Sequence, residues 1–240
     1  MIQLAVFDMA GTTIDDGGAV YRALAEAVTE TGATVDPGDL QTWMGTEKHA
    51  ALEALITLGG GTVTPEVVDT AYARFADILA DNYAARPPRP LLGIPETLAA
   101  LRAAGIRIAL TTGFTRAVAT GILEEMGWRI GSPGEDDVVT IDALVCGDEV
   151  AQGRPAPYLI HRAMERTGVV DVARVLTAGD TVVDVRAGIN AGVAHTVGVL
   201  TGELTVDDFA AAGFAPGESE RVHILASVTE VPALWEIAAV

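Results

Sequence analysis

Short and nearly uninterrupted apolar segments recur along this chain, and segments of helical periodicity lie between most of them. Runs of this kind are typical of strands buried on both faces, as in a parallel sheet covered by helices. The strand-like segments are residues 2–8, 106–112, 143–147, 175–180, 195–200 and 223–226. The helical patterns between and after them are residues 95–104, 116–126, 157–167, 182–191 and 228–237. This alternation predicts an α/β fold with a doubly wound, Rossmann-like parallel sheet, in which ligands bind at the carboxyl ends of the strands.

Residues 16–89 interrupt the alternation, because they show helical periodicity without a comparable strand-like segment. The helical patterns there are residues 19–31, 39–44, 47–58 and 65–85. Turn-forming sequences flank this stretch, with Asp15-Asp16-Gly17-Gly18 before the first helix and a proline-rich segment, 86–93, after the last. We therefore expect an all-helical cap domain at 16–89, inserted into an α/β core domain made of 1–15 and 90–240.

The charge balance limits the partners of the chain. Its 15 basic and 33 acidic residues give a net charge of −18, which repels phosphodiester backbones and anionic lipid surfaces. The sequence has no apolar stretch long enough to span a bilayer, no signal peptide at its start and a single cysteine, Cys146. We expect a soluble cytoplasmic protein that acts on a small molecule, with no nucleic-acid or membrane partner. Composition does not separate a saline habitat from an ordinary solvated surface as the origin of the acidity.

Acidic residues follow two of the predicted buried strands. Asp8 ends the first strand, while Asp180 and Asp184 lie where a later strand gives way to a helix. Each of them alone is equally well explained as a loop or capping aspartate. Because carboxyl ends of parallel strands meet at one edge of a sheet, Asp8 and Asp180 could share a divalent cation, which prefers oxygen ligands.

Two further segments are expected at the same edge. Thr112 and Gly113 end the second core strand and offer a hydroxyl and free amides to an anion. Arg154, in the segment Gly153-Arg154-Pro155, places a fixed cation before a helix, although a lone arginine is more often a surface charge. Taken with the acids, these segments supply a nucleophile, a hydroxyl, a cation and a metal-binding acid in chain order.

This set of motifs resembles the haloacid dehalogenase superfamily of phosphotransferases, and the likeness extends over essentially the whole chain, with a helical cap inserted after the first motif. The resemblance implies a Mg²⁺ cofactor, an aspartyl-phosphate intermediate and the possibility of a homodimer. It also implies these roles: Asp8 as nucleophile and metal ligand, Ala10 as a carbonyl ligand, Asp180 as the late metal acid, Asp184 as the orienter of metal-bound water, Thr112 and Gly113 as phosphoryl binders, and Arg154 as the positive charge.

Two departures point to one subfamily. Ordinary phosphatases of the superfamily carry a second aspartate as general acid two positions after the nucleophile, where this chain has Ala10. Without that proton, a monoester leaving group departs as a costly alkoxide of high pKa. The usual lysine before the last motif is Arg154 here. Both features resemble phosphonoacetaldehyde hydrolase (phosphonatase) and phosphonatase-like proteins, which open with the pattern Asp-x-Ala-Gly-Thr.

A lone lysine strengthens that resemblance. Lys48 is the only lysine in the chain and lies in the segment Met44-Gly45-Thr46-Glu47-Lys48, similar to the Met-Gly-x-x-Lys segment of phosphonatase caps. Cleavage of a carbon–phosphorus bond needs a sink for the electron pair left on carbon, and an amine condensed with a neighbouring carbonyl supplies one. An arginine is always protonated and cannot serve in this way. The resemblance implies that Lys48 forms the Schiff base and that Met44 and Gly45 bind the substrate.

The match to phosphonatases is incomplete. Their histidine three residues beyond the lysine is Ala51 here, and their tyrosine after Thr-Thr-Gly is Phe114. His49 follows Lys48 directly but projects about 100° away from it on a helix. We expect a hydrolase of phosphonoacetaldehyde or a similar 2-oxoalkylphosphonate. Two alternatives remain open: a small-molecule phosphate monoester phosphatase of the same superfamily, and an inactive phosphate-binding module.

Overall fold

The computed structural model describes residues 1–131 and 138–235. The chain divides into two compact units, which we call the core unit (Met1–Asp15 and Arg89–Val240) and the helical unit (Asp16–Pro88). The division falls between Pro88 and Arg89, one residue before the position expected from the sequence.

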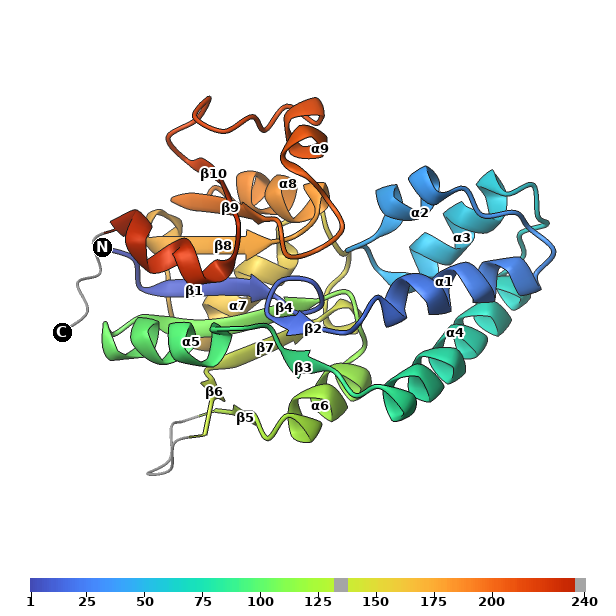
Figure 1. The fold of residues 1–240 in the computed structure, drawn as a ribbon, viewed down its shortest axis with the longest axis horizontal. Coiled ribbons are helices and arrows are strands. Elements are labelled where there is room, and N and C mark those ends of the chain that lie inside the picture. The colour runs from blue at the N-terminus through green and yellow to red at the C-terminus, as the bar shows by residue number, and fades with distance from the viewer. Residues whose placement is uncertain (132–137, 236–240) are drawn as a thin grey trace. The chain divides into compact units, whose positions relative to one another are not determined.

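The core unit is built on a six-stranded sheet (Figure 1). Its strands are β1 (Leu4–Asp8), β4 (Arg107–Thr112), β7 (Ala143–Cys146), β8 (Val175–Gly179), β9 (His195–Val199) and β10 (Val222–Leu225). They lie in the order β10-β9-β8-β1-β4-β7, and each neighbouring pair is parallel. This is the Rossmann strand order, in which the chain reverses its direction of travel across the sheet between β1 and β8. The predicted doubly wound α/β fold is confirmed.

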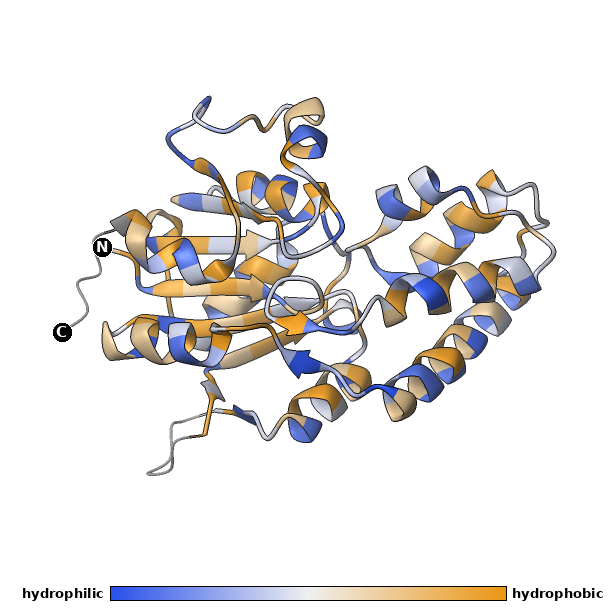
Figure 2. Cartoon of the chain, in the orientation of Figure 1, coloured by the Kyte–Doolittle hydropathy of each residue, from blue (hydrophilic) through white to orange (hydrophobic). Residues whose placement is uncertain are grey.

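Helices cover both faces of the sheet. On one face α7 (Tyr158–Thr167) and α8 (Val182–Ala191) pack against the strands and each other, and on the other α5 (Ile94–Ala103) packs beside a 3-10 helix, η3 (Val228–Trp235) (Figure 1). The helix α6 (Arg116–Glu125) contacts β7. Figure 2 shows the sheet as mainly hydrophobic and the helices as mixed, which is the pattern of strands buried on both faces.

The last predicted helix differs from the expectation. Residues 228–235 form a 3-10 helix with Pro232 inside it, and a proline cannot donate the amide hydrogen bond that an α-helix interior requires. The predicted end of this helix, at 236–237, lies outside the described residues.

Several short elements were not expected from the sequence. They are the antiparallel pair β2 (Ile14–Asp15) and β3 (Arg89–Pro90), the parallel pair β5 (Arg129–Ile130) and β6 (Thr140–Ile141), the helix α9 (Val206–Ala211), and the 3-10 helices η1 (Gly147–Glu149) and η2 (Val172–Arg174). The β2–β3 pair is the point at which the chain leaves the core unit for the helical unit and returns from it.

The helical unit contains four helices, which are α1 (Ala19–Glu30), α2 (Pro37–Trp43), α3 (Lys48–Leu58) and α4 (Pro65–Ala85). Both α1 and α3 pack against α4. Three of the helices begin with a residue whose side chain accepts backbone N–H groups of the first turn, namely Asp36, Glu47 and Thr64. These caps fix where α2, α3 and α4 begin. None of the helices in the described ranges is long and apolar enough to cross a membrane.

Candidate active site

Asp8 is the last residue of the central strand β1. Its neighbours in the sheet are β4 on one side and β8 on the other, so it lies at the position where the strand order reverses and where α/β sheets bind ligands. All five residues of β1 are buried, and Asp8 itself is 7% exposed. The Thr13 hydroxyl donates to the Asp8 carbonyl at 2.8 Å, and Gly11 has a positive φ of 81°, so the chain turns sharply after the strand.

Arg154 is buried between two aspartates. Its Nη2 lies 2.6 Å from Asp8 Oδ1, and its Nε lies 2.8 Å from Asp184 Oδ1. The same Nη2 donates to Thr111 Oγ1 at 2.9 Å. The arginine, expected to be a surface charge if taken alone, is only 7% exposed and joins the strands β1 and β4 to the helix after β8.

Asp180 follows β8 and is held against backbone. Its Oδ1 accepts the Thr12 hydroxyl at 2.9 Å. A Cβ built on Gly11 would lie 2.5 Å from Asp180 Oδ2, and one built on Gly202 would lie 2.1 Å from the same oxygen. The carboxylate therefore lies directly against two glycines that are far apart in the sequence.

Asp184 lies in the first turn of α8. Its carboxylate accepts the backbone N–H and the hydroxyl of Thr181, while the Thr181 hydroxyl caps the Asp184 amide, which makes a reciprocal capping box. Gly179 leaves room for this side chain, because a Cβ there would lie 2.2 Å from Asp184 Cγ. The cap orients Asp184 so that its other oxygen reaches Arg154.

Burial and mutual repulsion perturb the carboxylates. Burial is the largest effect on Asp8 and, with the nearby Asp184 charge, raises its pKa to about 6, although Arg154 acts in the opposite direction. Burial and the charges of Asp8 and Asp184 raise the pKa of Asp180 well above its usual value. Burial alone would lower the pKa of Arg154, but the Asp184 and Asp8 carboxylates outweigh it and raise that pKa.

The donor set fits a hard divalent cation. Three buried carboxylates, Asp8, Asp180 and Asp184, face one guanidinium, so the fully ionised cluster has a surplus of negative charge. Within residues 1–131 and 138–235, no three His, Cys, Asp or Glu side chains gather as a metal site. Asp8, Asp180 and the carbonyl of Ala10 would instead hold Mg²⁺, which commonly keeps several waters. The turn after β1 uses the carbonyls of Met9 and Ile14 for its own hydrogen bonds.

Thr112 and Gly113 lie at the carboxyl end of β4, beside Asp8 in the sheet. The Thr112 hydroxyl accepts the amide of Phe114 at 3.1 Å, which turns the chain sharply after the strand. The Gly147 amide donates to the Phe114 carbonyl at 2.9 Å, and a Cβ on Gly147 would lie 2.9 Å from the Gly113 carbonyl oxygen. The segment after β7 thus supports the segment proposed to bind phosphoryl oxygens.

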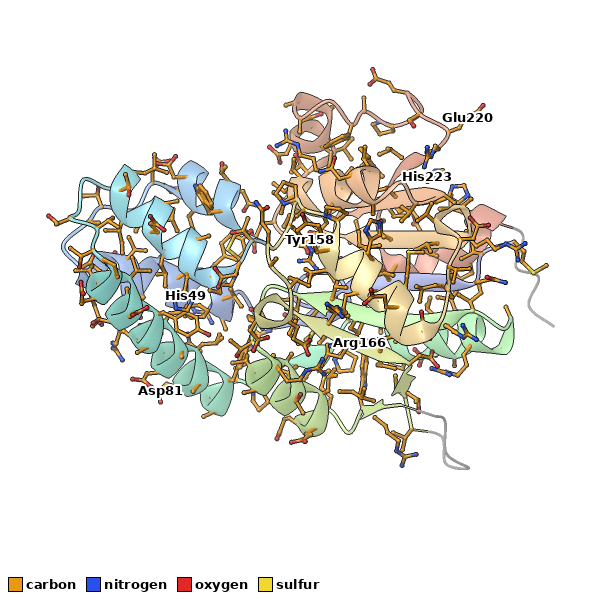
Figure 3. All side chains as sticks on the ribbon, turned by 180° about the vertical axis from the view of Figure 1, so that it is seen from behind. His49, Asp81, Tyr158, Arg166, Glu220 and His223 are labelled. Atoms are coloured by element: carbon orange, nitrogen blue, oxygen red, sulfur yellow. The ribbon has the colours of Figure 1, made fainter. Side chains whose placement is uncertain are left out.

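Glu149 anchors that supporting segment. Its carboxylate accepts from Arg116 Nη2 at 2.6 Å, from Arg166 Nη2 at 2.9 Å and from the Cys146 amide at 2.8 Å. Although burial alone would raise it, the hydrogen bonds from Arg166 and Arg116 lower the pKa of Glu149 to about 2. Arg166 comes from α7 (Figure 3), so this ion network links α6, α7 and η1.

Met44, Gly45 and Lys48 lie together in the helical unit. Met44 and Gly45, which has a φ of 76°, are in the turn after α2, and Lys48 is the first residue of α3. Lys48 is 4% exposed, and its Nζ donates to the Thr46 carbonyl at 3.2 Å. The Glu47 side chain therefore fixes the start of α3, and with it the position of Lys48 as the first residue of this helix.

His49 has its own partners within the helical unit. Its ring stacks on Tyr72 of α4, with centroids 4.0 Å apart, and its Nδ1 lies 3.2 Å from Glu47 Oε1 (Figure 3 labels His49). Ala51 and Phe114, which replace the histidine and tyrosine of phosphonatases, are both buried. Position 51 thus holds a packed methyl group in place of a proton carrier.

The structure adds residues that sequence reasoning missed. Thr12, Thr111 and Thr181 hydrogen-bond the charged groups, and Gly202 packs on Asp180. Thr12 and Thr111 adjoin the motifs, and the pattern Thr-x-x-Asp at 181–184 is a recognisable capping box. Gly202 gave no such signal, because its role depends on β9 lying next to β8.

The sequence matches the haloacid dehalogenase-like hydrolase family over residues 2–192. This match covers most of the chain, and the chain belongs to that family of hydrolases.

Within the family, named phosphonoacetaldehyde hydrolases are among the similar proteins. The protein of that name from Bacillus cereus (strain AH187) is 30% identical over 241 residues, which cover 93% of this chain and 86% of the relative. The solved structures include a phosphonoacetaldehyde hydrolase-like protein from Oleispira antarctica, with a TM-score of 0.74, 22% identity, and coverage of 98% and 92% of the two chains. A β-phosphoglucomutase from Clostridium difficile is also similar, with a TM-score of 0.77, 16% identity, and coverage of 99% and 97%. At these identities the structural matches show the fold alone.

Proposed function

We propose that this hydrolase cleaves the carbon–phosphorus bond of phosphonoacetaldehyde or a similar 2-oxoalkylphosphonate, with Lys48 as the Schiff-base amine and Asp8 as the nucleophile. The helical unit would then serve as the cap domain. The proposal requires both residues to reach one substrate molecule, the amine at its carbonyl carbon and the carboxylate at its phosphorus.

The observation that carries the proposal is that the chain lacks the general acid of a monoester phosphatase and has a single lysine, which is buried. Ala10 stands where a monoester phosphatase needs a proton donor, and the only lysine of the chain is buried at the start of a helix. A primary amine is the side-chain group that condenses with a carbonyl, and Lys48 supplies the only one in the sequence. The names of the relatives at about 30% identity support the same chemistry.

The first covalent step joins the lysine to the substrate. The Lys48 amine adds to the substrate carbonyl and water leaves, which gives a protonated imine next to the carbon that bears phosphorus. An Asp8 oxygen then attacks phosphorus, the carbon–phosphorus bond breaks, and its electron pair moves into the imine to form an enamine. A proton returns to that carbon, and water hydrolyses the resulting imine to release the aldehyde or ketone and free Lys48.

The second half of the cycle frees Asp8. Water attacks the phosphorus of the aspartyl-phosphate, the phosphorus–oxygen bond to Asp8 breaks, and inorganic phosphate leaves. Arg154 and the amides around Thr112 and Gly113 would meet the charge on the phosphoryl oxygens. When bound, Mg²⁺ supplies further positive charge at those oxygens. With a pKa of about 6, Asp8 is mainly the nucleophilic carboxylate at neutral pH.

The test traps the lysine adduct. The protein is incubated with phosphonoacetaldehyde and Mg²⁺, reduced with borohydride, and analysed by intact mass and peptide mapping, with Lys48→Arg as the matched control. A reduced adduct confined to Lys48, together with phosphate release from unreduced samples, supports the proposal.

Other outcomes favour the alternatives. If neither adduct nor phosphate forms with phosphonoacetaldehyde, a panel of other 2-oxoalkylphosphonates follows, and failure there overturns the proposal. Turnover of sugar or glycolate phosphates that tolerates Lys48→Ala would identify a monoester phosphatase. Binding of Mg²⁺ and phosphate without any turnover would identify a phosphate-binding module.

A further inference from the structure

The loop after β9, which none of the four motifs includes, forms one wall of the slot that holds Asp180. We propose that Thr201 and Gly202 of this loop are positioning residues that fix the Asp180 carboxylate for a divalent cation. The inference rests on the divalent cation of the proposed function and on Asp180 as one of its ligands, and it is independent of the chemistry at Lys48.

Position 202 must be glycine, because a side chain there would collide with Asp180. A Cβ at this position would lie 2.1 Å from Asp180 Oδ2 and 2.8 Å from both Cβ and Cγ of that aspartate. The φ of Gly202 lies outside the left-handed region, so an alanine there is excluded by contact with the carboxylate and not by its backbone conformation. Any larger residue must displace Asp180 or the loop.

Gly11 also lines the slot. A Cβ on Gly11 would lie 2.5 Å from the same Asp180 Oδ2, and Thr12 donates to Asp180 Oδ1 at 2.9 Å. Oδ2 of the carboxylate thus lies against two glycines, and Oδ1 is oriented by a hydroxyl. Such confinement matters because like charges from Asp8 and Asp184 would otherwise drive this side chain away from the cluster.

Thr201 connects the two segments that contain Gly202 and Gly11. Its hydroxyl donates to the Gly11 carbonyl at 2.6 Å, which links the loop after β9 to the turn after β1 across the end of β8. This hydrogen bond sets the width of the slot. A small Mg²⁺ ion demands near-ideal octahedral geometry, whereas Ca²⁺ accepts flexible coordination, so a widened slot should harm Mg²⁺ binding more.

The experiment measures cation binding without substrate, by calorimetry on the full chain well below its unfolding temperature. In Gly202→Ala we expect the Kd for Mg²⁺ to rise about tenfold or more, as outer-sphere substitutions at metal sites commonly do, and the Kd for Ca²⁺ to rise less. Gly121→Ala is the matched control, because a Cβ on Gly121 in α6 meets no atom within 4 Å and should leave both constants unchanged.

A second pair of variants keeps the test decisive if Gly202→Ala does not fold. Thr201→Val should raise the Mg²⁺ Kd several-fold, while Thr201→Ser, which retains the hydroxyl, should restore it. Wild-type Mg²⁺ affinity in Gly202→Ala or Thr201→Val, equal losses for Mg²⁺ and Ca²⁺, or no Mg²⁺ binding by the wild type would each overturn the inference. Failure to trap an adduct at Lys48 with phosphonoacetaldehyde and with the panel of other 2-oxoalkylphosphonates would overturn the proposed phosphonatase function and leave this result standing.

Discussion

The two units assemble their functional groups in opposite ways. At the sheet edge of the core unit, Asp8, Arg154 and Asp184 come from distant parts of the chain and each depends on the others for charge compensation. In the helical unit, Lys48 is placed by its immediate neighbours in the sequence, because Glu47 caps the helix that the lysine begins and the Thr46 carbonyl accepts from its amine. The groups that we propose for phosphorus chemistry therefore form a cooperative cluster, while the amine that we propose for carbonyl chemistry is held by local contacts, and mutation should separate the two.

The sharpest separation is expected from Asp8→Asn. Loss of the proposed nucleophile should lower phosphate release by at least about 10⁴-fold, since removal of a covalent catalyst costs most of the rate enhancement. The Lys48 adduct should still form and be trapped by borohydride, because imine formation does not use Asp8. Phosphate assays and peptide mass spectrometry on the same samples test both statements, and loss of the adduct would show that the two units do not act independently.

Stability should distinguish the same two regions. Arg154→Met leaves buried carboxylates without their cation and should lower the free energy of unfolding by about 3–5 kcal/mol. Lys48→Met keeps the length of the side chain and replaces its amine with an apolar end, so the free energy of unfolding should stay within about 1 kcal/mol of the wild type. Urea denaturation without divalent cations measures both, and equal losses would contradict the contrast between cluster and local feature.

A smaller effect is expected at the periphery of the cluster. Glu149→Gln weakens the hydrogen bonds from Arg116 and Arg166 and should cost about 1–2 kcal/mol, since these groups are partly exposed. The matched control is Glu165→Gln, which removes an exposed pair with Arg162 on the same helix as Arg166 and should change stability by less than about 0.5 kcal/mol. Thermal unfolding compares the two variants. An equal shift in unfolding temperature would mean that the ion network of Glu149 does not stabilise the segment after β7.

The smallest effect concerns pH. The folded pKa of Asp8 is raised from 3.8 to about 6, so the folded state holds a proton that the unfolded state has already lost, and the associated stability disappears as pH rises through 6. In the absence of divalent cations, Asp8→Asn should therefore gain about 1 kcal/mol relative to the wild type between pH 5 and pH 7. Parallel denaturation at the two pH values tests this, and a pH-independent difference would refute the raised pKa.

Most of the fold followed from the sequence because buried parallel strands are continuous apolar runs. The segment expected at 2–8 contains β1, and that expected at 175–180 contains β8. Two-residue ladders such as β2–β3 are too short to show any periodicity, and α9 is a six-residue helix whose cap Thr205 was not used as a start signal. The apolar spacing of 228–235 indicates a helix but not its type, and Pro232 within it disfavours the α conformation.

The site was less predictable than the fold. Strand ends indicated where Asp8 and Asp180 would lie, but the roles of Ala10, Arg154 and Lys48 came from family resemblance. Only the structure shows which of these groups contact one another. Arg154 contacts Asp184 and Thr111, and these residues are brought close to it by the order of strands in the sheet and not by the sequence. The division of labour between Thr111, which contacts the arginine, and Thr112, which caps the turn, reflects the alternation of side chains along a strand.

The small ladder between β2 and β3 places the departure and the return of the inserted segment side by side. An insertion whose two ends are already joined by backbone hydrogen bonds can be exchanged without rerouting the rest of the chain. The core unit that we propose performs attack at phosphorus can in this way be retained, while a different insert with a different reactive group would direct it to another class of substrate. The β2–β3 pair is therefore a fixed attachment point in the core unit, and the helical unit attached to it can be replaced.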